Sequence, residues 1–142
     1  MDFNSQMEMK GRLTISINNE VVRDIDNLVV TTGKGYVASR MKDATATAMS
    51  HMAVGTDSTA AADGDTTLGG ESARVALTST TVSGAVITYV ATFAAGTGTA
   101  ALTEAAVLNA SSSGTMLCRT VFAVVNKGAN DAMSVSWAVT AS

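Results

Sequence analysis

Proline is absent from this chain of 142 residues, and cysteine and histidine each occur once. With Cys118 alone, no intrachain disulfide can form. One histidine, His51, and one cysteine are too few for a zinc site of nitrogen and sulfur ligands, so no metal is expected there. Turns without proline must rely on the 12 glycines and on asparagine and aspartate.

Charge is also scarce, because charged residues make up 15% of the chain and roughly 25% of an ordinary soluble domain. The net charge is −3 and no basic run occurs, so no nucleic-acid partner is expected. The chain lacks both a long apolar stretch and the apolar segment of a signal peptide, so no membrane partner is expected. Weakly charged surfaces are typical of interfaces, which predicts a subunit of an assembly. The alternative is a monomer of low solubility.

The N-terminal third contains the clearest hairpin signal. Residues 11–17 (GRLTISI) alternate apolar and polar side chains, which predicts a half-buried strand. Asn18-Asn19 fits a two-residue turn, since asparagine tolerates positive φ. We expect the return strand over residues 20–25 and a further turn at Asp26-Asn27.

A short helix and several strands are expected after the hairpin. Thr31 or Thr32 is in position to cap a helix over residues 33–42. The spacing of short apolar runs then predicts a β-sandwich or jelly-roll, a mainly β fold of antiparallel sheets. The expected strands are residues 49–54, 73–80, 85–93, 101–108, 116–125 (the central strand) and 133–140, the last with Val135, Trp137 and Val139 facing inward.

The chain divides by composition into parts that we expect to form one compact domain. Residues 1–10 are predicted to be an N-terminal arm, and residues 11–54 a hairpin plus a short helix. Residues 55–142 are predicted to be the β-sandwich body. That body opens with a long loop of small and acidic residues, from Gly55 to Gly70.

The candidates for nucleophilic or nucleotide chemistry are weak. Thr32-Gly33-Lys34-Gly35 resembles part of a phosphate loop, but the required earlier glycine and following Ser or Thr are absent. His51 has no recognisable catalytic context, and Cys118 lies in an apolar strand where a thiol is unreactive. No enzyme activity, catalytic residue or cofactor is therefore expected.

The carboxylates in the long loop have two interpretations, as metal ligands or as acceptors for the loop backbone. Asp57, Asp63 and Asp65 carry hard oxygen ligands suited to calcium, although their spacing matches no calcium loop. The alternative, which we favour, is that these side chains accept backbone N–H bonds and hold a loop without proline in shape.

An ion pair is expected among the later charged residues, with two candidates. Charges within apolar strands are costly to bury unless they are paired, which predicts Glu104–Arg119 or Glu71–Arg74 as contacts that define the fold. The alternative is a pair of carboxylates for glycoside chemistry. It is not favoured, because no aromatic sugar platform accompanies them.

A set of short segments, read in order, resembles a known family across about residues 10–140. The most specific are Ala53-Val54-Gly55-Thr56, then Asp65-Thr66-Thr67-Leu68-Gly69 with Glu71 and Arg74, and Gly114 to Phe122 (GTMLCRTVF). Supporting segments are residues 27–33, 102–105 and 135–137. Together these segments resemble a family of small tailed-bacteriophage virion proteins, described as capsid decoration (cement), tail-fibre or generic structural proteins.

The resemblance implies a non-enzymatic β protein of the virion, assembled in the host bacterial cytoplasm. We expect a capsid decoration protein that bridges capsomers, binds the major capsid protein and self-associates, as a homotrimer. The alternative is a tail, baseplate or fibre component. A more distant alternative is a carbohydrate- or receptor-binding module, which would need exposed aromatic side chains.

Overall fold

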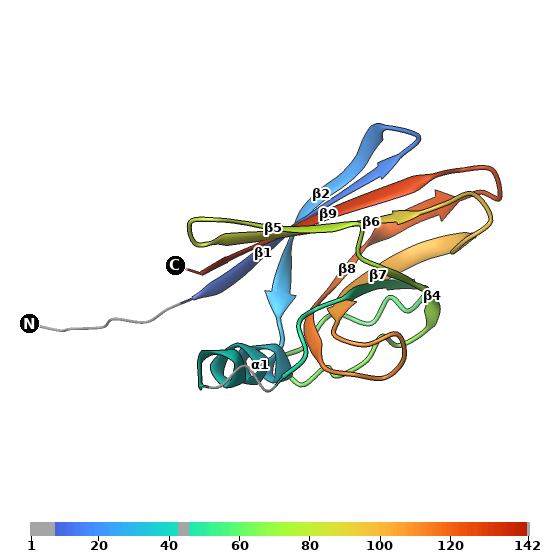
Figure 1. Ribbon diagram of the computed structural model, residues 1–142. Helices are drawn as coiled ribbons and strands as arrows, with labels where there is room; N and C mark the ends of the chain where they lie inside the picture. Colours follow the sequence, from blue (N-terminus) through green and yellow to red (C-terminus); the bar gives the residue numbers. More distant parts are fainter. Residues whose placement is uncertain (1–7, 43–45, 142) are drawn as a thin grey trace, which may run out of the picture.

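The computed structural model describes residues 8–42 and 46–141, and within them the chain forms nine strands and a helix (Figure 1). In chain order these are β1 (Met9–Ile17), β2 (Glu20–Val29), α1 (Thr31–Lys42), β3 (His51–Gly55), β4 (Glu71–Ala76), β5 (Ser79–Ser83), β6 (Val86–Phe93), β7 (Ala100–Leu108), β8 (Met116–Lys127) and β9 (Met133–Ala141).

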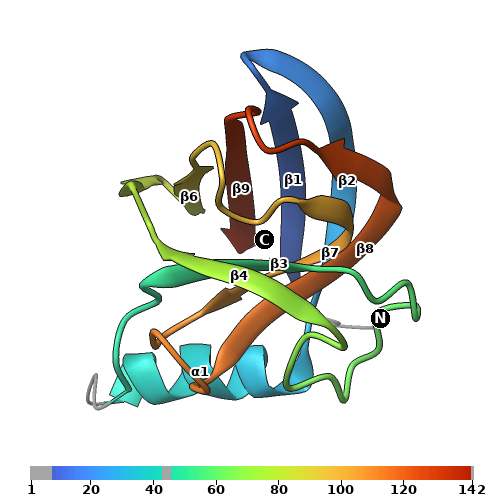
Figure 2. The same cartoon turned by 90° about the vertical axis from the view of Figure 1, so that its right-hand side faces the viewer.

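All nine strands belong to one antiparallel sheet, in the order β4-β3-β7-β8-β2-β1-β9-β6-β5. The junction in its middle is narrow, because β2 pairs with β8 only through Leu28↔Arg119 and Val29↔Cys118. The sheet curls about this junction, so that β3, β4, β7 and β8 cross in front of β1 and β2 (Figure 2). The predicted mainly β class is confirmed, whereas the two separate sheets of a sandwich are not, since β2 joins both halves.

The main core lies between the two halves of the curled sheet. Its members come from both halves and include Leu13, Phe93 and Trp137, each fully buried. The inward direction predicted for Val135, Trp137 and Val139 on β9 is confirmed. The alternation of apolar and polar residues along β9 therefore predicted its buried face correctly.

Two predicted strand boundaries are wrong. β2 does not end at Ile25 but continues through Asp26-Asn27 to Val29, because its last residues pair with β8. Residues 73–80 are not one strand but two, β4 and β5, which lie at opposite edges of the sheet. Between them Leu77 N–H donates to Ser50 O (2.9 Å), and Thr78 N–H donates to Val90 O (2.7 Å), so the chain passes from one half to the other.

The predicted hairpin turn is confirmed. Asn18 and Asn19 have φ of 49° and 69°, the left-handed values that a two-residue turn between β1 and β2 requires. Strand β8 pairs on both sides, with β7 and β2, as expected of a central strand. Of the predicted N-terminal arm, residues 1–7 lie outside the described residues, and Met9 and Lys10 already belong to β1.

The predicted helix is confirmed, and it begins two residues earlier, at Thr31. The Thr32 hydroxyl donates to Met116 O (3.1 Å), and Thr31 N–H donates to Asp63 O (2.8 Å). Gly33 is the buried residue of the helix, where an added Cβ would lie 2.0 Å from Leu117 O. The first turn of α1 therefore needs a residue without a side chain in order to pack on β8.

Two glycines of α1 give a matched pair of substitutions. We expect Gly33→Ala to lower the free energy of unfolding by about 1–3 kcal/mol, because the methyl group meets the β8 backbone. Gly35→Ala should raise it by about 0.5–1 kcal/mol, because nothing lies within 4 Å of the new Cβ and alanine favours the helix. Urea denaturation measures both. Equal midpoints for the two variants would contradict this packing.

Candidate functional site

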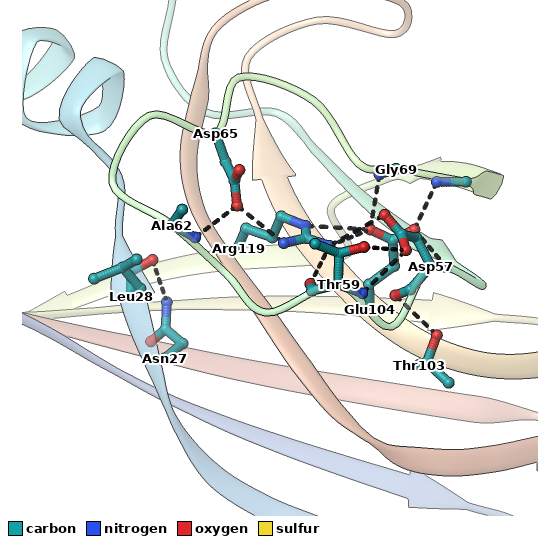
Figure 3. A network of polar contacts seen from close by, with 11 residues as sticks. Asn27, Leu28, Asp57, Thr59, Ala62, Asp65, Gly69, Thr103, Glu104 and Arg119 are labelled. Atoms are coloured by element: carbon teal, nitrogen blue, oxygen red, sulfur yellow. Dashed lines mark hydrogen bonds and ion pairs between the residues drawn. The ribbon is translucent and has the colours of Figure 1, made fainter.

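The outer face of β3, β7 and β8 is buried under the long loop. Small side chains there, such as Ala53 and Ala106, form a second apolar cluster with Leu68 of the loop. The loop runs across the strands at the place where two charged side chains point outward from the sheet (Figure 3). This half of the sheet is therefore covered on both faces.

A buried ion pair occupies the centre of this face. Glu104 on β7 and Arg119 on β8 have 0% and 2% of their surface exposed. Both Nε and Nη2 of Arg119 donate to Glu104 Oε1, at 3.2 and 3.0 Å. The predicted Glu104–Arg119 pair is confirmed, and its full burial means that each charge depends on the other.

The Glu104 carboxylate also binds the loop backbone. Its Oε1 accepts a hydrogen bond from Gly69 N–H at 3.0 Å. Its Oε2 accepts from Asp57 N–H at 3.0 Å and from Gly70 N–H at 2.8 Å. The carboxylate thus accepts five hydrogen bonds in all, and it ties both ends of the loop to β7.

Arg119 binds the middle of the same loop. Its Nη1 donates to Asp65 Oδ2 at 2.9 Å, and its Nη2 donates to Thr59 O at 3.1 Å. Asp57 Oδ2 lies 3.9 Å from Nη2, so this guanidinium faces three carboxylates, two from the loop and one from β7. We call Glu104, Arg119, Asp57 and Asp65 the polar centre.

Two of the three loop aspartates, Asp57 and Asp65, act as the favoured interpretation predicted, with side chains that accept backbone N–H bonds. Asp57 Oδ1 accepts from Thr59 N–H (3.0 Å), and Asp65 Oδ2 accepts from Ala62 N–H (2.9 Å). The hydrogen bonds from the Thr59 backbone and hydroxyl, helped by the charge of Arg119, hold the pKa of Asp57 below its usual range. Asp63 is exposed, and its carbonyl oxygen meets the start of α1.

Glycines make room for the polar centre. Gly55 on β3 lies opposite Glu104, and a Cβ there would be 2.6 Å from Glu104 Oε2 and 2.4 Å from Gly70 O. At Gly69 a Cβ would collide with the Asp57 carboxylate. The loop can bring its N–H groups this close to the carboxylate only because these positions carry no side chain.

The second predicted ion pair is confirmed as well. Arg74 Nη2 and Nε donate to the two oxygens of Glu71, at 2.7 and 3.1 Å. Arg74 Nη1 also donates to the carbonyl oxygens of Ala110 and Ser113, at 3.0 and 2.8 Å. This arginine therefore fixes the turn between β7 and β8 to the edge strand β4.

The remaining candidates are spread over the fold. His51 is half-buried at the start of β3, with Nδ1 2.8 Å from Ser50 Oγ. Cys118 is fully buried on β8, and burial raises the pKa of its thiol, in agreement with an unreactive side chain. Thr32 to Gly35 lie in the first turns of α1, where Lys34 N–H donates to Val30 O and the Thr32 hydroxyl donates to Met116 O. The structure brings none of these three candidates together with another.

Sequence reasoning missed an apolar groove of about 370 Å³ between α1 and the sheet. Its walls include Tyr36, Met41, Met49, Tyr89 and Val139. Met49 N–H donates to the Tyr36 hydroxyl at 3.2 Å, which joins α1 to the segment before β3. The available signal was the apolar spacing of Tyr36, Val37 and Met41, which indicated only a helix face.

The charged groups of the polar centre bind one another and the loop backbone. Within residues 8–42 and 46–141, no group of three or more His, Cys, Asp or Glu side chains is placed to hold a metal ion. The helix α1 lacks the length and apolar character needed to span a membrane, and the described residues hold no other candidate.

Comparisons with protein-family models, curated proteins and solved structures find no match. The resemblance to phage virion proteins therefore stays a hypothesis.

The importance of the buried pair can be tested by removing one charge. We expect Glu104→Gln to lower the free energy of unfolding by about 3–5 kcal/mol, because Arg119 loses its buried partner. The control Glu71→Gln removes an ion pair with a partly exposed carboxylate and should cost less than about 1 kcal/mol. Urea denaturation measures both. A cost for Glu104→Gln as small as that of the control would show that the pair does not hold the loop.

Proposed function

We propose that this protein is a structural component of a tailed-bacteriophage virion. Within that class we propose a capsid decoration protein, which bridges capsomers, contacts the major capsid protein and self-associates as a homotrimer. Its role is mechanical and non-enzymatic. Its place is the virion, and neither a nucleic acid nor a membrane is a partner.

One observation carries this proposal, namely the place of the segments that resemble the phage family. Gly55, Asp65, Gly69, Glu104 and Arg119 come from four of those segments and meet at the polar centre. The segments are far apart in the sequence, and their shared environment gives a physical reason for their residue types. The segments that resemble the phage family thus contribute to one structural unit, the long loop held on the sheet.

The chemistry of that unit supports a structural role. The carboxylate of Glu104 is buried and accepts five hydrogen bonds from the protein itself. A catalytic acid or base needs access to a substrate, and this carboxylate is enclosed by Asp57, Gly69, Gly70 and Arg119. A loop held in one shape suits a protein that offers a fixed surface to a neighbour.

The mechanism would be an increase in contact area between capsid subunits. Expansion of a capsid during DNA packaging opens sites between capsomers, and a small protein bound there joins its neighbours. An interface of standard size, about 1,600 Å², can bind tightly, and the repetition of sites on a lattice strengthens attachment. The scarcity of charge in the sequence fits such contacts.

For attachment we propose strand addition to a neighbour's sheet through the N-terminal arm and hairpin, residues 1–26. The structure narrows this idea, because β1 already pairs on both sides, with β2 and β9. Only residues that precede Met9 lie ahead of that strand. Of the predicted arm, residues 1–7 lie outside the described residues.

The location on the particle can be tested by counting copies. Quantitative labelling of purified virions with an antibody against this chain should show many copies spread over the head. That result follows because a decoration protein occupies sites all over the capsid lattice. A few copies confined to the tail would overturn the decoration role and would favour a tail, baseplate or fibre component.

The arm can be tested by truncation. A variant lacking residues 2–7 keeps β1 intact, so its thermal unfolding should match that of the full chain. We expect it to bind expanded capsids at least tenfold more weakly in a sedimentation assay. Undiminished affinity would contradict the arm while leaving the decoration role standing.

A carbohydrate- or receptor-binding module receives less support. Such a module needs exposed aromatic side chains, and Tyr89, Phe93, Phe122 and Trp137 are buried. Tyr36 is half-buried in the wall of the apolar groove, and Phe3 lies outside the described residues. The described aromatic residues therefore form core and groove rather than a sugar platform.

A further inference from the structure

The two edges of the sheet differ in how well they are protected. At the β4 edge, Arg74 binds Glu71 and the carbonyl oxygens of Ala110 and Ser113. At the β5 edge, all five residues, Ser79 to Ser83, are exposed. This second edge carries neither charge nor proline.

An edge strand of this kind readily pairs with another strand. Proteins usually block such edges with lysine, proline, a β-bulge or a covering segment. The pairing of β5 with β6 is regular over residues 79–83, without a bulge. The β5–β6 hairpin reaches the outer limit of the molecule, on the side of the C-terminus (Figure 1).

The side chains of β5 include an apolar one without cover. Val82 lies opposite Ile87 of β6 and has 71% of its surface exposed. Thr80, on the same face, lies opposite Tyr89 and borders the apolar groove. A strand added at this edge would cover Val82 and lengthen the wall of the groove.

The sequence of β5 is nearly symmetric about its central residue. It reads Ser79-Thr80-Thr81-Val82-Ser83, so reversal exchanges serine for serine and threonine for valine. Threonine and valine have nearly the same shape, and both suit β-sheets. A two-fold interface requires a surface that is complementary to itself, and this strand meets that requirement.

We propose that β5 pairs antiparallel with β5 of a second copy of this chain, about a two-fold axis at Thr81. In this register Thr81 faces Thr81 of the other copy, and Ser79 faces its Ser83. Thr80 faces Val82, which brings together β-branched side chains on the groove side and opposes no like charges. The two sheets then continue as one across the interface.

The contact is small, because five residues from each copy take part. Stable complexes usually bury more than about 1,200 Å², so we expect weak pairing between free molecules. Copies held side by side by another attachment would pair far more fully, since their effective concentration is high. In a homotrimer such a two-fold contact would join neighbouring trimers rather than form the trimer. The inference is independent of the phage proposal.

Cysteine substitution tests both the contact and its register. In the proposed pair the two Thr81 Cα atoms lie about 4.5–5.5 Å apart, within the range that a disulfide spans. We expect Thr81→Cys to form disulfide-linked dimers under mild oxidation at least tenfold faster than the control Ser111→Cys. The control lies in an exposed turn, and the native Cys118 is buried and does not compete.

Two further variants fix the register. Ser79→Cys alone should cross-link slowly, because four residues separate its two copies, roughly 13 Å. A mixture of Ser79→Cys and Ser83→Cys should give the cross-linked heterodimer rapidly. If each reduced variant unfolds at the same temperature as the unmodified protein, these exposed substitutions leave the fold intact.

A charge at the axis gives an independent test. Thr81→Lys places two ammonium groups opposite each other, so the concentration-dependent dimerisation that we expect of the unmodified chain in analytical ultracentrifugation should disappear, while Ser111→Lys should retain it. Cross-linking of Thr81→Cys no faster than the Ser111→Cys control would overturn the proposal. So would rapid cross-linking of Ser79→Cys alone, or loss of cross-linking when residues 2–7 are deleted, which would indicate the arm as the partner of β5.

Discussion

The buried ion pair between Glu104 and Arg119 is the interaction on which the outer half of the fold depends. A buried charge is tolerated only when its partner and hydrogen bonds replace the lost water. Glu104 obtains that replacement from Arg119 and from N–H groups of the loop. The loop must therefore dock on the sheet for the pair to be stable, and the pair in turn holds the loop.

This mutual dependence explains the composition of the chain. A half-sheet covered on one face by the main core and on the other by a loop needs apolar residues in succession rather than in alternation. Strand β7 shows this, because residues 102–108 are all buried. Small side chains such as Ala53 and Ala106 let the loop approach, and Gly55 leaves space for the Glu104 carboxylate.

The proposed function belongs to the surface rather than to the polar centre. The centre uses its charges to fix the loop, so recognition falls to edges, hairpins and the N-terminal segment. Strand β5 is the least protected of these, since its five residues are exposed and uncharged. Pairing through backbone groups needs a free edge, so the exposed β5 edge gives the sheet a direction in which it can grow.

The sequence by itself determined the mainly β class, the Asn18-Asn19 turn, the buried face of β9 and both ion pairs. Each follows from local signals: positive φ at asparagine, a period of two, or the cost of an unpaired buried charge. Only the tertiary structure decided that residues 73–80 split between two edges, that β2 joins both halves, and that α1 borders a groove. These features depend on which distant strands supply hydrogen bonds. A run of alternating residues looks the same whichever strand it pairs with, so the pattern could not reveal them.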